Sequence, residues 1–286
     1  FVGNALIEHL TSLGHETWRL VRRAPADDRS IGWDPDKGRL DAAACEGFGA
    51  VIHLGGENIA AGRWTKRRKK RIRNSRVNST RFLALTLSRL NLPPKVFLCA
   101  SAIGIYGDRG DESLTESSLP GTGFLADVVH EWERACEPAT TRAIRVVNCR
   151  LGIVLGKDGG ALAKLLGVFR SGLGGRIGGG RQYWSWISLG DAVRAMTFCL
   201  ESEQLHGPVN LVSPAAVTNH DFTKTLGRTL HRPTLIPFPA WAARLILGEM
   251  ADASLLASTR AEPAALTNAG FEFRHPQLAA ALAAAI

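Results

Sequence analysis

The first 23 residues constrain the fold most, because they open partway through a recognisable unit. Gly3 stands at the start of an apolar segment whose leucines recur at helical spacing, at Leu6, Leu10 and Leu13. A strand-like segment follows at residues 16–23 and ends in Arg22 and Arg23. A helix, a short turn and a strand with a polar tip form the second half of a β-α-β dinucleotide-binding unit. Gly3 is then the last glycine of a G-x-x-G-x-x-G motif or of a related one.

The other half of this unit, its first strand and first two glycines, is expected just upstream of residue 1. A parallel sheet without that central strand would expose apolar side chains and leave backbone N–H and C=O groups unpaired. We therefore expect the sequence to be an N-terminally clipped fragment.

Strand-like and helix-like segments alternate through about residue 160. The segments with strand character are residues 50–56, 95–101 and 144–150, and those with helix character are residues 66–90 and 123–137. Strict alternation predicts an α/β fold, a Rossmann-type doubly wound parallel sheet with right-handed crossovers. Ligands of such sheets bind at the carboxyl ends of the strands.

Glycines and loops become frequent beyond residue 160, which predicts a change of domain. We expect a Rossmann domain that binds NAD(P) over residues 1–160, with its first strand missing upstream. A smaller C-terminal α+β lobe over residues 161–286 would bind the substrate. The end of this lobe is rich in alanine.

The net charge of +9 raises the question of a nucleic-acid partner, since much of it lies in the basic run at residues 63–73. Such a run can bind phosphates. It continues, however, into the apolar positions of an amphipathic helix, and no nucleic-acid-binding signature accompanies it. We interpret it as a solvated helix face and expect no nucleic-acid partner.

Membrane and metal partners are not expected either. No apolar run approaches the roughly 18 to 20 residues that a spanning helix needs. The five cysteines lack metal-ligand spacing, and free thiols of this kind suit a reducing compartment such as the cytoplasm, although a targeting peptide could not be seen in this sequence. They are Cys45, Cys99, Cys136, Cys149 and Cys199.

The arginine pair predicts the cofactor. Arg22 and Arg23 stand where the second strand of a dinucleotide unit meets the adenosine ribose, and a carboxylate there would accept the free 2′-hydroxyl of NAD. Two arginines instead suit the 2′-phosphate of NADP. Trp33 and Asp34 are candidates for the lining of the adenine pocket. The alternative for Trp33 is an ordinary core position.

Ser101 is the last residue of the strand-like segment at residues 95–101, and this strand end is the one most suggestive of catalysis. A serine there can hydrogen-bond a substrate carbonyl or hydroxyl beside a nicotinamide ring. It can equally well cap a strand-to-loop turn.

These motifs together resemble the extended short-chain dehydrogenases/reductases. The resemblance is closer to an atypical branch, the sugar-nucleotide-epimerase-like proteins, and it covers essentially the whole chain. The tail from about residue 233 resembles a C-terminal domain particular to that branch. The motifs that carry the resemblance include His53-Leu54-Gly55-Gly56-Glu57, Ser75-Arg76-Val77, Ser101 to Gly107, Arg150-Leu151-Gly152, Gly180-Arg181-Gln182 and Trp186 to Asp191. The resemblance implies cofactor contacts from Gly3, Leu54, Gly55, Gly56, Glu57, Arg76 and Leu151.

The sequence departs from the superfamily at the catalytic pair. A Tyr-x-x-x-Lys motif normally follows the serine by about two dozen residues, and Phe124 and Val128 stand there instead. Neither side chain can exchange a proton. Tyr106 is the best remaining proton donor, with Arg76 or Lys157 as the cation that would lower its pKa. The alternative is that Tyr106 is a turn residue packed under the loop.

A second departure concerns the substrate. Sugar-nucleotide enzymes of the extended class carry an arginine that grips the substrate diphosphate, and Trp184 stands at the corresponding place. If Trp184 lines the site, it favours a flatter or less charged ligand. If it belongs to the core, it gives no information about the ligand. Arg170, Arg176 and Arg181 remain nearby for an anionic substrate.

The sequence thus predicts an NADP-dependent oxidoreductase, or an epimerase-like enzyme, that acts on a small molecule. The alternative is a non-catalytic NADPH-binding sensor, because the usual catalytic pair is missing. Helix pairs of this fold often build homodimers, although nothing in the sequence requires one.

Overall fold

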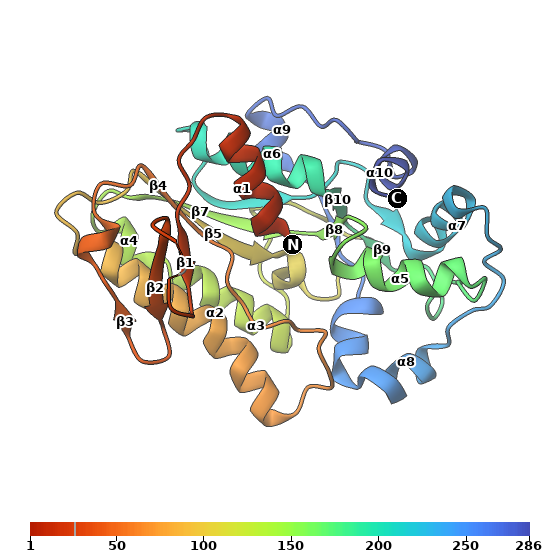
Figure 1. Ribbon diagram of the computed structural model, residues 1–286. Helices are drawn as coiled ribbons and strands as arrows, with labels where there is room; N and C mark the ends of the chain where they lie inside the picture. The colour runs from red at the N-terminus through yellow and green to blue at the C-terminus, as the bar shows by residue number, and fades with distance from the viewer. Residues whose placement is uncertain (26) are drawn as a thin grey trace.

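Four parallel strands form the central sheet of the computed structural model, which describes residues 1–25 and 27–286. Their order is β11-β7-β5-β4, and every neighbouring pair is parallel. Figure 1 shows the labelled strands β4, β5 and β7 in the layer between the helices. The strands are β4 (Ala50–His53), β5 (Val96–Ala102), β7 (Arg145–Leu151) and β11 (Gly207–Leu211). The predicted Rossmann-type doubly wound α/β fold is confirmed.

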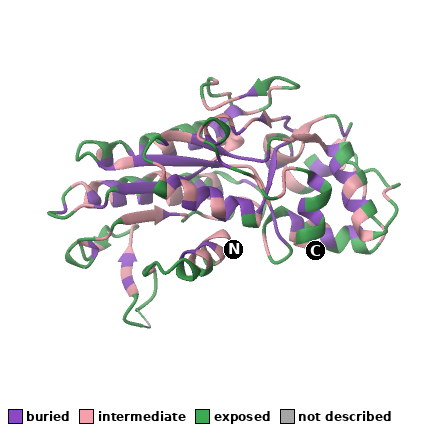
Figure 2. Cartoon of the chain, turned by 90° about the horizontal axis from the view of Figure 1, so that it is seen from above, coloured by how far each residue is buried: buried purple, intermediate pink, exposed green. Residues whose placement is uncertain are grey.

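Helices cover both faces of this sheet because the side chains of its inner strands alternate between two apolar clusters. Phe97 and Cys99 of β5 pack with α2 (Lys66–Leu87) and α3 (Phe124–Arg134). Val96 and Leu98 pack with α1 (Val2–Ser12) and α6 (Leu189–Glu201) on the other face. Figure 2 shows the buried strands enclosed between the helices. A strand buried on both faces reads as a continuous apolar run, and residues 95–101 show that pattern.

A second small sheet flanks the central one without joining it. β1 (Arg19–Val21) pairs in parallel with β2 (Ser30–Asp34), and β2 pairs antiparallel with β3 (Arg39–Leu40). β1 is shorter than the strand predicted over residues 16–23. Within residues 1–25 and 27–286, no ladder of hydrogen bonds joins β1 to β4.

The helix predicted over residues 123–137 ends earlier, and a separate short helix begins at the last predicted residue. α3 ends at Arg134, and the short α4 (Glu137–Thr140) follows with Pro138 in its first turn. Proline has no backbone N–H and fits only the first turn of a helix, which explains the break.

The C-terminal region builds a separate apolar cluster beside the sheet. β8 (Ile153–Leu155) pairs in parallel with β10 (Trp186–Ser188), and helices of this region pack around that pair. Because β11 belongs to the central sheet, the chain returns across the predicted boundary at residue 160, and that boundary stays a prediction. The remaining elements are β6 (Ser113–Leu114), α5 (Gly160–Arg170), β9 (Tyr183–Trp184), β12 (Val217–Thr218), α7 (Asn219–Leu230), α8 (Ala240–Leu247), β13 (Arg260–Ala261), α9 (Ala264–Asn268) and α10 (Leu278–Ala285), with single turns at Ala43–Cys45, Ile103–Tyr106 and Ala251–Leu255.

The buried carboxylate of Asp191 fastens the C-terminal tail to the first turn of α6. Its two oxygens accept hydrogen bonds from the backbone N–H groups of Arg274 and His275, each at 2.9 Å. Arg194 and Ser188 also donate to it. The tail is therefore held through its backbone at a fixed place.

The basic run lies on the first turns of α2, as the amphipathic pattern predicts, and several of its cations have acidic partners. Arg68 and Arg71 lie 3.6 Å from a carboxylate oxygen of Glu57, Lys69 lies 2.7 Å from Glu249, and Arg73 is paired with Glu131. That the chain binds no nucleic acid stays a prediction. All five cysteines are buried free thiols. Of the helices in the described residues, none is long and apolar enough to cross a membrane.

Candidate functional site

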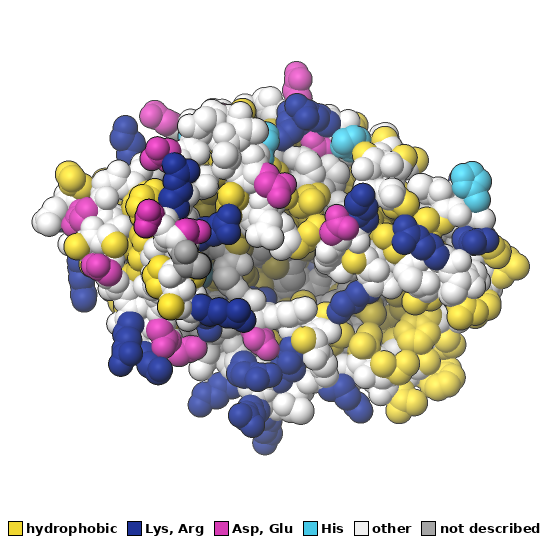
Figure 3. Space-filling model, in the orientation of Figure 1, with side chains coloured by type: hydrophobic (Ala, Val, Ile, Leu, Met, Phe, Trp, Pro, Cys, Tyr) yellow, Lys and Arg dark blue, Asp and Glu magenta, His cyan; other side chains and the backbone are white. Residues whose placement is uncertain are grey.

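Five of the predicted cofactor residues line one cavity, to which β1, β4 and the first turn of α1 contribute: Gly3, Arg22, Trp33, Leu54 and Gly55. A Cβ atom on Gly3 would lie 3.7 Å from Cδ1 of Leu54, so the start of α1 touches the residue that follows β4. Figure 3 shows a hollow near the middle of this face, bordered by several Lys and Arg side chains. A helix N-terminus at the edge of such a hollow favours anionic groups, because its N–H groups are free and its dipole is positive there.

Gly55 and Gly56 form an exposed loop that leaves little room for side chains. A Cβ atom would fall 2.9 Å from Cε1 of His53 at Gly55 and 3.1 Å from Cζ of Arg76 at Gly56. Glycine therefore keeps the neighbouring side chains in place and leaves the backbone accessible to a ligand.

Arg76 fastens this loop to α2. Its guanidinium donates to the carbonyl oxygens of Glu57 and Ile72, at 3.0 and 3.1 Å, and stacks 5.2 Å from the ring of Trp132. Burial lowers the pKa of Arg76, and the charge of Glu57 acts in the opposite direction. The Glu57 N–H donates to Ser75 Oγ at 2.9 Å, which fixes the other end of the loop.

Arg22 and Arg23 are both exposed just beyond β1. Arg22 Nη1 lies 3.3 Å from Oδ2 of Asp36, which is itself exposed. Exposed ion pairs contribute about 0–1 kcal/mol, so an anionic ligand could replace this partner at little cost. Asp34 accepts a hydrogen bond from the Lys37 N–H. Within the described residues, no hydrogen bond joins Asp34 to Arg22 or Arg23.

Trp33 belongs to the core. It is 9% exposed and meets the His53 ring edge-on, with ring centroids 5.6 Å apart. His53 Nε2 lies 3.3 Å from Ser79 Oγ, and burial, helped by the charge of Arg22, lowers the pKa of His53 to about 4. Of the two alternatives for Trp33, the structure favours the core one. Leu151 is half-buried at the carboxyl end of β7, beside Ala102 of β5.

Ser101 does not present a free hydroxyl. It is 3% exposed, and its Oγ donates to Oε1 of Glu133, a residue of α3, at 2.5 Å. Arg150 lies directly opposite Ser101 on β7 and donates to both carboxylate oxygens of Glu133, at 2.8 and 2.9 Å. Burial alone would lower the pKa of Arg150, but the hydrogen bonds and charge of Glu133 raise it above its usual value.

The expectation that Tyr106 serves as an accessible proton donor needs correction. Its side chain is fully buried, its hydroxyl accepts from Arg150 Nη1 at 2.9 Å, and it donates to Asn210 Oδ1 at 2.8 Å or to the Thr115 carbonyl at 3.0 Å. Burial raises the pKa of Tyr106, and the charge of Arg150 only partly offsets this. The cation next to Tyr106 is thus Arg150, not Arg76 or Lys157. Tyr106 packs under the loop, as the alternative prediction states.

Glu133 is the residue that the sequence prediction missed. Together with Ser101, Arg150, Tyr106 and Asn210 it forms a continuous, largely buried chain of hydrogen bonds, here called the Glu133 network. Its position could have been read from helical spacing, because Ala126, Val129 and Glu133 share one face of α3 and the first two are buried apolar residues. An acidic residue on an apolar helix face requires a buried partner.

Phe124 and Val128 are both packed. Phe124 meets the Trp64 ring edge-on at 5.2 Å and lies 4.5 Å below Lys69 Nζ, and Val128 is buried. Trp184 is also a core residue: it packs against Phe222 at 5.2 Å and donates to the Leu255 carbonyl. Its ring therefore gives no information about the ligand.

Comparison with known proteins identifies the family. The sequence profile described as "NAD dependent epimerase/dehydratase family" matches residues 1–211, well over half of the chain. The chain belongs to this family. A domain of unknown function, DUF1731, matches residues 238–285 of the tail.

Two members of the family are similar over nearly their whole length. An epimerase family protein of Mycobacterium leprae is 42% identical over 281 residues, which cover 98% of this chain and 91% of that protein. The human epimerase family protein SDR39U1, crystallised with NADPH, has 32% identity and a TM-score of 0.91 over 100% of this chain and 95% of that one. The predicted resemblance to the atypical, epimerase-like short-chain dehydrogenases/reductases is confirmed.

More distant structures share the fold alone. A UDP-galactose 4-epimerase superposes with a TM-score of 0.75 at 16% identity, over 100% of this chain and 94% of that one. The roles predicted for individual site residues stay predictions, and so does the strand expected upstream of residue 1, which these comparisons do not confirm.

Proposed function

We propose that this chain binds NADPH where α1, β1 and β4 meet and uses it in the oxidoreduction or epimerisation of a small molecule. The observation that carries the proposal is the exposed pair Arg22 and Arg23 just beyond β1, since Arg22 lines the same cavity as Gly55 of the open loop. The NADPH in the crystal structure of SDR39U1 supports the choice of cofactor.

The residues present fit the parts of this cofactor. Arg22 and Arg23 would hold the 2′-phosphate through charge-assisted hydrogen bonds. The first turn of α1 would face the diphosphate, and the glycine loop, fixed by Arg76, would allow backbone to approach closely. When bound, the nicotinamide supplies the hydride chemistry, and the protein binds and orients.

A specific observation favours a second candidate, an NADPH-binding protein without turnover. The hydroxyl of Tyr106 is buried within the Glu133 network. The positions where the sequence analysis expects the usual proton-transferring pair carry the apolar residues Phe124 and Val128. In this candidate, NADPH binding changes the protein's interactions but no hydride leaves the cofactor.

Calorimetric titration tests the cofactor proposal. We expect NADPH to bind more tightly than NADH, and Arg22→Ala/Arg23→Ala to weaken NADPH binding by about tenfold or more while leaving NADH binding almost unchanged, because charged hydrogen bonds to the phosphate are lost. Arg29→Ala, which removes an exposed arginine at the amino end of β2, serves as the control and should bind like the parent. Equal affinity of the double variant and the parent for NADPH would refute the role of the arginine pair.

Turnover distinguishes the two candidates. NADPH consumption with a panel of carbonyl compounds would support the enzyme. Tight NADPH binding without consumption of NADPH across that panel would favour the binding protein.

A further inference from the structure

The outer side of α8 and the segment just before it form an apolar surface. Twelve large apolar side chains are exposed in the described part of the chain, and five of them lie within residues 235–246. Leu235, Trp241 and Leu245 are 79%, 68% and 67% exposed. Every residue of α8 except Arg244 is apolar, yet only Ala243 is buried. Helices that are apolar on all sides are normally buried, so the exposure of α8 requires an explanation.

The loop after α5 extends this apolar surface. A Cβ atom on Gly175 would overlap the backbone carbonyl of Ile236, so the loop touches the segment before α8. Leu173 of this loop is more than half exposed. Contiguous groups of large exposed apolar side chains mark interaction sites. The following residues are here called the α8 patch: Leu173, Leu235, Ile236, Trp241, Leu245 and Ile246.

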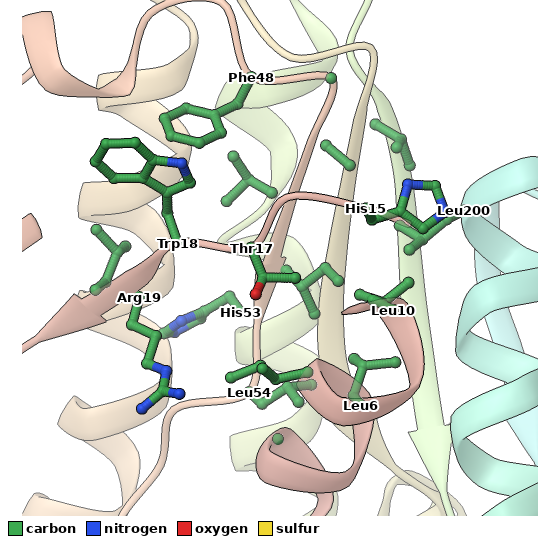
Figure 4. A pocket seen from close by; sticks show the side chains of 18 of the residues that line it. Leu6, Leu10, His15, Thr17, Trp18, Arg19, Phe48, His53, Leu54 and Leu200 are labelled. Atoms are coloured by element: carbon green, nitrogen blue, oxygen red, sulfur yellow. The ribbon is translucent and has the colours of Figure 1, made fainter. Parts of the chain in front are cut away.

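The α8 patch is separate from the proposed cofactor site. Arg22 and Gly55 line a cavity of about 1040 Å³ (Figure 4), and no residue of the α8 patch lines that cavity. A function of the patch is therefore additional to cofactor binding.

The segments that carry the α8 patch are positively charged. Residues 159–190 and 222–248 contain eight Lys and Arg residues and no Asp or Glu. Within the described residues, Arg244 is the only one of these eight in an ion pair, with Asp252 at 2.9 Å. The apolar surface is thus surrounded by cations whose charges are largely uncompensated.

The basic first turns of α2 lie next to the end of α8. Arg63 Nε lies 3.5 Å from the place of a Cβ atom on Gly248, the residue that follows α8. Within residues 1–25 and 27–286, no ion pair neutralises Lys66, Arg67 or Lys70, and all three are exposed. Figure 3, in the orientation of Figure 1, shows the apolar area over α8 and the Lys and Arg side chains beside it.

We propose that the α8 patch and the basic first turns of α2 bind the surface of a membrane that contains anionic phospholipids. The Trp, Leu and Ile side chains would enter the boundary between headgroups and acyl chains. The Lys and Arg side chains would lie among the anionic headgroups. No membrane partner is expected from the sequence, because no apolar run is long enough to span a bilayer; binding at the interface needs no such run.

Other partners fit these observations less well. A nucleic acid would neutralise the cations, but its phosphates do not account for exposed Leu and Ile side chains. A second copy of this chain would place the same basic surroundings opposite each other, and like charges in an interface are unfavourable. The net charge of +9 adds to that repulsion.

Cosedimentation with lipid vesicles tests the proposal without any cofactor, so its outcome is independent of the proposed function. The vesicles consist of phosphatidylcholine alone or of phosphatidylcholine with about one-third phosphatidylserine. We expect the parent protein to bind the anionic vesicles about tenfold more tightly or better, and the binding to weaken as salt is added. Absence of binding to both kinds of vesicle would overturn the proposal.

Two matched pairs of variants locate the binding surface. Trp241→Ser/Leu245→Ser should weaken binding to anionic vesicles by about tenfold or more, because apolar surface no longer enters the membrane. Its control, Leu92→Ser/Leu119→Ser, removes exposed apolar side chains outside the α8 patch and should bind like the parent. Circular dichroism checks that both variants are folded. Equal binding by the two variants would overturn the role of the patch.

The second pair concerns charge. Arg67→Gln/Lys70→Gln should weaken binding to anionic vesicles by about tenfold, whereas Arg81→Gln/Arg89→Gln, which removes two exposed cations beyond the first turns of α2, should have a smaller effect. Equal effects of the two variants would show that the basic first turns of α2 take no specific part.

Fluorescence separates insertion from adsorption by charge alone. Vesicles with brominated acyl chains quench a tryptophan that reaches the acyl boundary, so they should quench the parent more than Trp241→Phe. Equal quenching would show that the α8 patch does not enter the membrane. Analytical ultracentrifugation without lipid covers the alternative partner: a parent dimer that Trp241→Ser/Leu245→Ser converts to a monomer, together with no vesicle binding, would assign the patch to a second copy and overturn the membrane proposal.

Discussion

Replacing Glu133 by alanine is expected to destabilise the protein by about 3–5 kcal/mol, because it leaves the buried guanidinium of Arg150 without its counter-charge. Arg150 is 5% exposed, and two of its hydrogen bonds go to Glu133. The same substitution removes the acceptor of the Ser101 hydroxyl. Urea unfolding monitored by circular dichroism measures the change.

Glu137→Ala is the matched control for this substitution. Glu137 stands one helical turn further along and pairs with Arg134, but both side chains are more than 60% exposed. Its loss should change the free energy of unfolding by less than about 1 kcal/mol. Similar values for the two variants would show that the Glu133 network contributes no more than a surface ion pair.

Acidification from pH 6.5 to pH 4 is expected to cost about 3 kcal/mol of stability through His53 alone, from the difference between its ordinary pKa of 6.5 and its folded pKa of about 4. The folded state keeps the buried imidazole neutral, whereas the unfolded chain takes up a proton over this range. The unfolded state therefore binds more protons, and stability rises with pH across this window and levels off above pH 6.5.

His53→Gln isolates this contribution, since glutamine keeps a polar group near Ser79 but does not titrate. Carboxylates that titrate in the same range affect both proteins equally. The difference in unfolding free energy between parent and variant should therefore shift by about 3 kcal/mol between pH 7 and pH 4 in favour of the variant. Parallel pH profiles would show that His53 is not held neutral by the fold.

The parts of this structure that depend on local periodicity could be predicted from the sequence. The apolar runs at residues 50–56 and 95–101 became β4 and β5 within three residues at each end, and the helix predicted at 66–90 became α2. The open loop at Gly55 and Gly56 lies where the carboxyl-end rule for parallel sheets puts it. These features follow from short-range pattern and from a small number of topological rules.

The hydrogen-bond partners of the buried polar side chains could not be predicted from local patterns. Whether Tyr106 is accessible depends on Arg150 and Asn210, which lie 44 and 104 residues away along the chain. A single sequence does not show which of many polar residues meet in the interior. The exposed position of Arg22 and Arg23 just beyond β1 was easier to predict, because it depends on one local strand end.

The attachment of the tail at Asp191 joins the two segments into which the family matches divide the chain. The two matched segments, residues 1–211 and 238–285, are connected by hydrogen bonds in which a carboxylate of the first is satisfied by backbone of the second. If the chain were cut before Arg274, this carboxylate would keep its desolvation penalty and lose two of its donors. The region of unknown function is therefore tied to the rest of the chain by buried hydrogen bonds that either segment would lack on its own.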